Sequence, residues 1–367
     1  MRYAFAILLL LVVAGLADAC NVPVFRYALE RWHADSYRVT LFHRGPLTAA
    51  QQAVLEPLNE SAKPALNVSL RMVDVDQLET DGDRAMYAAL RQPTLPWLVV
   101  QYPQTSRIES LISAGPLDAA AIARLNTSPL RQKLTQRLAT GQTAVWLMLE
   151  CGDATKDDRV AQKLEAELAA LAQKLKLPEL TASPDDSLLS DAPLKIEFSL
   201  LRVPRNSPDE QPLVELLLHA EPDLKDFAEP MVFPVFGRGR ALLPLIGAGI
   251  TTENIQESAS FLVGACSCEI KELNPGFDLL LAADWQALLF RGAEPPETTP
   301  DQRLAATGEP VLVAIPPGTP SAPRDATDEA ARWVHDFHFS FVEPSWLVTG
   351  AAMFLLAGGF FAVRRFI

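Results

Sequence analysis

Short apolar runs, separated by clusters of glycine, proline and polar residues, recur along residues 37–140. Four of these runs have the length and composition of β-strands, and they cover residues 37–43, 68–74, 94–100 and 108–114. Helices are predicted after Thr48, from Asp83 and from Asp118, because polar residues there suit a helix N-terminus. The predicted order is therefore strand, helix, strand, helix, strand, strand, helix.

A second set of elements begins near Gly141. Strands are predicted over 143–151, 194–203 and 231–237, with a hairpin partner at 240–247 and a short apolar element at 213–219. Apolar residues at steps of three or four predict one face of an amphipathic helix: Val160, Leu164, Leu168, Leu171 and Leu175. Asp157 or Asp158 is its predicted cap, and another helix follows from Thr252 to Val263. The element order repeats that of the first set, which favours a duplicated α/β architecture.

A proline opens the third strand of the first set at Pro96, and Pro234 lies within the matching strand of the second. This element order with its strand-opening proline resembles the thioredoxin-like fold over residues 37–141, and the order is repeated over 141–290. The resemblance implies two tandem thioredoxin-like domains, each with a mixed central sheet and flanking helices. Their expected bounds are 20–140 and 141–290. It also implies that the proline is cis and faces the loop between the first strand and helix.

The thioredoxin-like resemblance further implies a Cys-x-x-Cys at that strand–helix junction. The first unit has His43-Arg44-Gly45-Pro46 there, which excludes dithiol exchange in that unit. The second has Cys151-Gly152-Asp153-Ala154, a monothiol variant. A helix N-terminus favours a thiolate, whereas neighbouring carboxylates such as Asp153 and Asp157 disfavour it. Cys151 is therefore a candidate nucleophile in an unfavourable electrostatic setting.

The chain has four cysteines, Cys20, Cys151, Cys266 and Cys268. A bond between Cys266 and Cys268 would close a very small ring and be easily reduced, which makes this pair a candidate redox site. In the alternative, one of the two pairs with Cys151 and the other with Cys20. Such disulfides would be structural, each contributing about 2–4 kcal/mol. Both alternatives remain open on the sequence.

The two ends of the chain predict export and membrane anchoring. Residues 1–19 have the charge, the apolar run and the small residues of a cleaved signal peptide, which leaves Cys20 either lipidated or as a plain first residue. A proline-rich tether and juxtamembrane segment is predicted over 291–343. A transmembrane helix over 344–363 follows, with a cytoplasmic tail at 364–367 that contains two arginines.

The anchor predicts a single-pass cell-membrane protein whose bulk is extracytoplasmic, and periplasmic if the source is bacterial. The net charge of −13 and isoelectric point near 4.9 argue against nucleic-acid binding, which requires a basic surface. The five histidines are scattered and none forms a zinc-binding motif, so neither a metal nor a cofactor is expected.

No catalytic triad or carboxylate pair is recognisable, so the sequence favours a non-enzymatic role without deciding it. The leading hypothesis is an exported, membrane-anchored protein of bacterial type. Its non-catalytic thioredoxin-like domains would bind an envelope protein as an interaction or scaffold module. Pro96, Pro234 and Cys20 are expected to be structural. The alternatives are an envelope thiol-disulfide oxidoreductase using Cys151 or Cys266/Cys268, and an accessory subunit of a membrane transporter.

Overall fold

The computed structural model describes residues 20–291, except for residues 60, 61, 63, 65, 107, 109, 110, 127 and 267–269. The described residues belong to one compact unit. The predicted signal peptide, the tether after residue 291, the transmembrane helix, the tail and Cys268 lie outside the described residues. Within the described part, no helix combines the length and apolar character that a membrane span requires.

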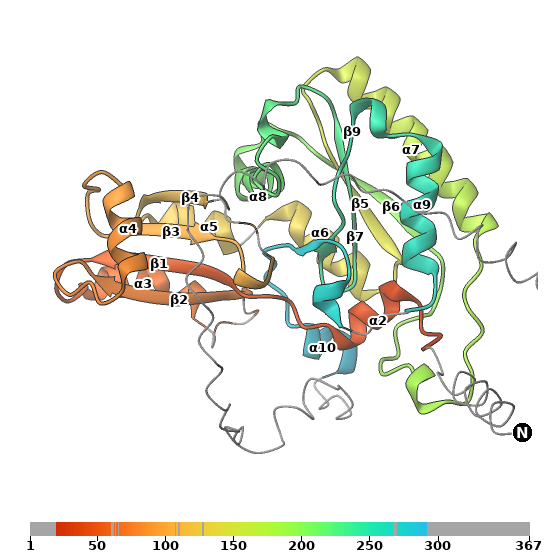
Figure 1. Ribbon diagram of the computed structural model, residues 1–367, viewed down its shortest axis with the longest axis horizontal. Helices are drawn as coiled ribbons and strands as arrows, with labels where there is room; N and C mark the ends of the chain where they lie inside the picture. The colour runs from red at the N-terminus through yellow and green to blue at the C-terminus, as the bar shows by residue number, and fades with distance from the viewer. Residues whose placement is uncertain are drawn as a thin grey trace, which may run out of the picture. The chain divides into compact units, whose positions relative to one another are not determined.

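The first sheet has the strand order β2-β1-β3-β4 (Figure 1). Its strands are β1 (Tyr37–His43), β2 (Val68–Asp74), β3 (Trp97–Gln101) and β4 (Leu111–Pro116). β1 runs parallel to β2 and antiparallel to β3, and β4 runs antiparallel to β3. The helices of this part are α3 (Ala49–Leu55), α4 (Asp81–Ala89) and α5 (Ala119–Asn126). The strand predictions over 37–43 and 68–74 are confirmed.

Alternate residues of the first sheet reach different helices. Val39 and Leu41 of β1 share a cluster with Leu55 of α3 and Ile122 of α5. Phe42, the residue after Leu41, joins a smaller cluster with residues of α4. Because successive side chains of a strand point to opposite faces, α3 and α5 cover one face and α4 covers the other.

The second sheet has the order β10-β8-β7-β5-β6, and β9 also pairs with β7. Its strands are β5 (Ala144–Leu149), β6 (Phe198–Val203), β7 (Met231–Phe236), β8 (Arg240–Ala241), β9 (Leu245–Ile246) and β10 (Phe277–Asp278). β5 is parallel to β6 and antiparallel to β7, which repeats the pairing of β1 with β2 and β3. The chain is therefore a mixed α/β protein with two sheets and flanking helices.

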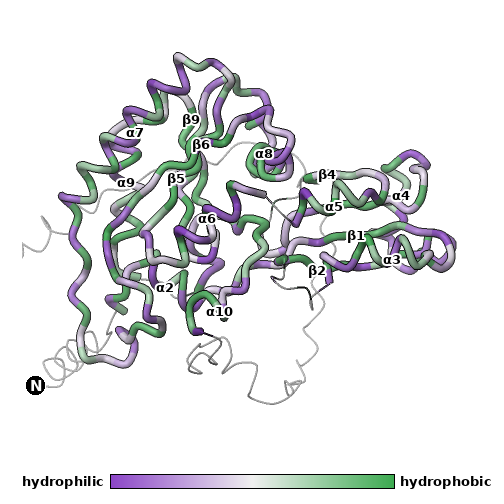
Figure 2. The backbone as a smooth tube through the Cα atoms, turned by 180° about the vertical axis from the view of Figure 1, so that it is seen from behind, coloured by the Kyte–Doolittle hydropathy of each residue, from purple (hydrophilic) through white to green (hydrophobic). Residues whose placement is uncertain are grey.

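Helices cover both faces of the second sheet. Trp146 and Met148 of β5 pack in a cluster with residues of α2 (Val24–Arg31), α7 (Ala154–Lys174) and α9 (Thr252–Val263). Val145 and Leu147 pack instead with residues of α6 (Pro129–Ala139), α8 (Gln211–Leu218) and α10 (Trp285–Phe290). A strand buried on both faces has no need of polar alternation. Figure 2 accordingly colours β5 as hydrophobic, whereas the tube of α7 alternates between hydrophilic and hydrophobic.

The two sheets share one hydrophobic cluster. Leu41 and Val100 of the first sheet belong to the same cluster as Leu147 and Phe233 of the second. At the boundary, the Tyr102 hydroxyl donates a hydrogen bond to the carbonyl of Leu216 in α8. The two sheets are therefore parts of one continuous core.

Several details of the predicted organisation are corrected. Helix α2 was not predicted; it packs with β7 and α9 of the second sheet, although its residues fall within the predicted first domain. Asp153, not Asp157 or Asp158, caps α7 by accepting from the backbone N–H groups of Thr155 and Lys156. The apolar element at 213–219 forms helix α8.

The two prolines singled out from the sequence differ in the structure. The Leu95–Pro96 peptide is cis, as the thioredoxin-like resemblance implies, whereas the bond before Pro234 is not. Pro234 pairs with Trp146 in the middle of β7, at the gap between the residues that pair with β9 and those that pair with β8. A proline lacks the N–H that a continuous ladder needs, so a break between two short partner strands accommodates it.

Candidate functional site

The junction after β5 holds Cys151 next to a buried carboxylate. The backbone N–H groups of Cys151 and Gly152 donate to the two oxygens of Asp157, at 2.9 and 3.1 Å. Asp157 lies in the first turn of α7 and is 2 % exposed. This carboxylate therefore takes the backbone donors of Cys151 and Gly152 and places a negative charge beside the thiol.

The environment of Cys151 disfavours the thiolate. Burial makes the largest contribution and raises the pKa of the thiol. The backbone N–H of Asp153 lowers it, but the hydrogen bond and charge of Asp157 raise it again, and with a small lowering by Lys156 the net direction is upward. A nucleophilic cysteine needs the reverse, a lowered pKa. Cys151 also carries a free thiol, so a structural disulfide through Cys151 is wrong.

The junction after β1 is closed by its own hydrogen bonds. The imidazole Nδ1 of His43 lies 2.8 Å from the carbonyl oxygen of Gly45, and the Gly45 N–H donates to the Asp74 carboxylate at 3.2 Å. Phe42 pairs with Trp97, so the register places His43 opposite Pro96. The predicted position of Pro96 beside this loop is confirmed, and the loop presents an imidazole where the resemblance implies a thiol.

The second sheet has a proline at the matching place, but it is Pro230 and not Pro234. Leu149 pairs with Met231, so the register places Pro230 opposite Glu150 at the start of the Cys151 junction. Pro234 lies inside the apolar run of β7, whereas Pro230 precedes it. Only the register between β5 and β7 shows which of the two prolines lies beside the Cys151 junction, and the sequence does not reveal that register.

Cys20 and Cys266 lie in one buried cluster beneath α2 and α9. The Cys20 thiol donates to the carbonyl of Asp185 at 3.3 Å, and the Cys266 N–H donates to the carbonyl of Val22 at 2.9 Å. Cys20 is 5 % exposed and Cys266 is 1 % exposed. Both therefore occupy core positions of the second sheet, and the predicted Cys266–Cys268 pair lies partly outside the described residues.

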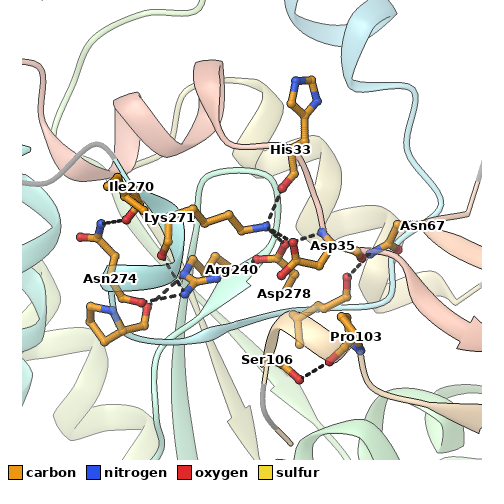
Figure 3. A network of polar contacts seen from close by, with 12 residues as sticks. His33, Asp35, Asn67, Pro103, Ser106, Arg240, Ile270, Lys271, Asn274 and Asp278 are labelled. Carbon is orange, nitrogen blue, oxygen red and sulfur yellow. Dashed lines mark hydrogen bonds and ion pairs between the residues drawn. The ribbon is translucent and has the colours of Figure 1, made fainter. Parts of the chain in front are cut away.

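A network of charges lies where the N-terminal segment meets β8 and β10; we call it the Lys271 network, consisting of His33, Asp35, Arg240, Lys271 and Asp278 (Figure 3). Arg240, Lys271 and Asp278 are buried, Asp35 is partly buried, and the exposed His33 takes part through its backbone carbonyl. The Lys271 ammonium donates to the carbonyl of His33 and to the carboxylates of Asp35, at 2.8 Å, and Asp278. Arg240 pairs with the other oxygen of Asp278 at 3.3 Å. Sequence analysis missed this network.

The Lys271 network is balanced in charge. Two cations face two carboxylates, and the three donors of the ammonium all have acceptors. A neighbouring cavity of about 110 Å³ borders Asp35, Arg240 and Lys271, yet it meets no unused cation there. Arg240 also donates to the carbonyls of Pro275 and Asn274. The network therefore links separate chain segments, and its charged groups are already paired with one another.

A larger cavity of about 190 Å³ lies beside the outermost strand of the first sheet; we call it the β4 cavity. Its lining comes from β3, β4, α5, α8 and the segment after β10: Leu98, 112–116, Ala121, Arg124, Leu125, Gln211, Pro212, Glu215 and Leu280. Most of this surface is apolar. In Figure 1, α5 and α8 lie beside β4, which agrees with the lining.

Among the described residues, no group of three or more His, Cys, Asp or Glu side chains is placed to hold a metal ion. No protein-family model matches the chain, and no curated protein matches its sequence. A solved structure of the first two thioredoxin domains of Naumovozyma dairenensis Eps1p is similar at 12 % identity, over 67 % of this chain and 97 % of that one. Its TM-score of 0.17 is too low to establish a shared fold.

Proposed function

We propose that this chain is an exported, membrane-anchored protein whose two thioredoxin-like domains bind a protein of the cell envelope and do not catalyse thiol exchange. The strand pairings support the domain assignment. In each half a central strand has a parallel neighbour on one side and an antiparallel neighbour on the other, and a proline precedes the antiparallel strand. The thioredoxin-like resemblance implies these pairings, and it also implies a cis proline, which among the described residues is found in the first half at Pro96 and not at Pro230.

The environment of Cys151 carries the non-catalytic part of the proposal. Dithiol exchange needs a second thiol to resolve the mixed disulfide, and Ala154 stands at that position. It also needs a stabilised thiolate, whereas burial and Asp157, which accepts from the Cys151 and Gly152 N–H groups, raise the pKa of the thiol. The junction after β5 therefore lacks both a second thiol and a stabilised thiolate, the two requirements for dithiol exchange.

An insulin-reduction assay tests this. Full-length protein and its Cys151→Ala variant are compared in the presence of dithiothreitol. We expect both to precipitate the insulin B chain no faster than dithiothreitol alone. Reduction by the wild-type protein that is lost in Cys151→Ala would reject the proposal and favour the oxidoreductase alternative.

Membrane anchoring rests on residues 344–363, and it has a separate test. Removing residues 344–367 should release the protein from the membrane fraction into the soluble fraction. Protease added to intact spheroplasts should digest the bulk of the full-length chain. Protection from the protease would contradict the extracytoplasmic location.

A further inference from the structure

We propose that the β4 cavity is the docking site for an extended segment of a partner protein, which pairs with the free edge of β4 and inserts one apolar side chain beside Gly115. This deepens the proposed function, on which it rests, by naming the binding surface and the chemistry of its occupant. The occupant is an extended apolar segment that carries an acidic residue next to the inserted side chain.

The backbone of β4 has hydrogen-bonding groups on its free side. The strand order ends at β4, so only β3 pairs with it among the described strands. The Leu117 N–H donates to the carbonyl of Pro96, and bonded pairs alternate along an antiparallel ladder. Gly115, paired with Leu98, therefore faces β3, and the N–H and C=O of Ala114 face outward. An added strand gains its backbone bonds at this kind of edge.

The cavity lies on the correct side of that edge to receive a side chain. Leu98 belongs to the cluster under α5, and its partner Gly115 points to the same face of the sheet. Val99 belongs to the cluster under α4, so the side chain of its partner Ala114 points away. Ala114 therefore lines the cavity with its backbone and not with its side chain. A strand paired at Ala114 would place its neighbouring side chain next to Gly115, where a Cβ has no atom within 4 Å.

The size of the cavity favours a side chain over a small-molecule ligand. Pockets for drug-sized ligands hold about 300–1,000 Å³. The β4 cavity holds about 190 Å³, behind a mostly apolar surface. That volume suits one apolar side chain and part of the backbone that carries it.

The charges at the rim select the residue next to the inserted side chain. Arg124 is exposed at the cavity and has no ion pair with any residue in the described part of the chain. Glu215, also at the rim, accepts a hydrogen bond from Gln211, and its other carboxylate oxygen lies 3.4 Å from Nδ1 of His219. Arg124 is therefore the rim charge that lacks a partner in the described part of the chain, and an acidic residue complements it.

The test selects peptides with the full-length protein. A phage-displayed library of random dodecapeptides is panned on it, and enriched sequences are made as fluorescein-labelled peptides for anisotropy titration. We expect alternating apolar residues with an acidic neighbour. Gly115→Leu, which fills the cavity from β4, should weaken binding by about tenfold or more. Arg124→Glu should weaken it less.

A matched control places the same side chain on the opposite edge of the sheet. Ser69 is exposed on β2, so Ser69→Leu should leave binding unchanged. Ala121→Leu fills the cavity from α5 and replaces Gly115→Leu if that variant fails to fold. Folding is checked by thermal unfolding of each variant.

The outcomes separate this inference from the proposed function. Enriched peptides that bind Gly115→Leu or Ala121→Leu as tightly as wild type would overturn the β4 site while a binding role stands. A library without enriched peptides would overturn the extended-peptide occupant. Neither result bears on the insulin assay, which alone decides whether the protein reduces disulfides.

Discussion

The central strands of the second sheet and the outer strand of the first differ in how much of each is covered. All residues of β5 and β7 are buried, because helices cover both faces of that sheet. In β4 only Ile112 is buried, and Leu111 is 40 % exposed. Both sheets use the same pairing at their centre. The difference indicates that the covered central strands supply stability, whereas β4 leaves an edge that a partner can use.

The largest effect is expected where the Lys271 network joins the N-terminal segment to the second sheet. Lys271→Met should destabilise the protein by about 3–5 kcal/mol, because it leaves the carboxylates of Asp35 and Asp278 buried without their ammonium partner. Chemical denaturation measures the change in the free energy of unfolding.

The control for Lys271→Met is an exposed ion pair in the first sheet. Arg44 pairs with Asp76, and both side chains are more than 60 % exposed. Arg44→Met should cost no more than about 1 kcal/mol. Equal losses in the two variants would contradict a special role for the buried network.

An intermediate effect should distinguish the two sheets directly. Leu147→Ala in β5 removes a side chain that is 0 % exposed and should cost about 2–5 kcal/mol. Leu111→Ala in β4 makes the same chemical change at an exposed position and should change stability by about 0.5 kcal/mol or less. A large loss for Leu111→Ala would mean that β4 is covered, which would also weaken the docking proposal.

The smallest effect concerns the pH dependence of stability. Burial lowers the pKa of His33, and the charges of Arg238 and Lys271 lower it further. The folded state therefore binds the proton less readily than the unfolded state, whose histidine titrates near pH 6.5. Stability due to this group is present above that pH and is lost as the pH falls toward the folded pKa.

Unfolding free energies measured between about pH 7.5 and pH 5 test this expectation for a histidine. The wild-type protein should lose more stability on acidification than His33→Gln, because glutamine does not titrate. Since His43 and His219 are present in both proteins, the comparison isolates His33. Parallel pH profiles for the two proteins would contradict the prediction.

Local pattern was enough to predict most of the regular elements. Strands β1 and β2 have the predicted bounds, and the leucine spacing of α7 correctly indicated its buried face, which includes Leu164, Leu168 and Leu171. These elements were readable because each has one buried side or one apolar run bounded by turn residues. The absence of a Cys-x-x-Cys at the junctions after β1 and β5 could also be read directly from the sequence.

Helix α2 could not be predicted in the same way. All of its residues are buried, including Arg26 and Glu30, whose side chains pair at 2.9 Å. Charged residues ordinarily indicate a solvent-facing side, so the segment shows no helical stripe. Besides this ion pair, the surrounding chain supplies partners that cannot be read from the segment itself, such as the Leu189 and Ser190 backbone N–H groups that donate to Glu30.

The amino-acid sequence by itself determined most of the order of strands and helices, the absence of a Cys-x-x-Cys at both junctions and the apolar character of β5. Tertiary structure decided which proline stands beside each junction, how Asp157 acts on Cys151, and that residues as distant as Asp35 and Asp278 share one buried ammonium. It also placed α5 and α8 around the free edge of β4. The physical reason is that propensity and periodicity act over a few neighbouring residues. Strand register, charge pairing and cavities depend instead on segments that meet only when the chain has folded.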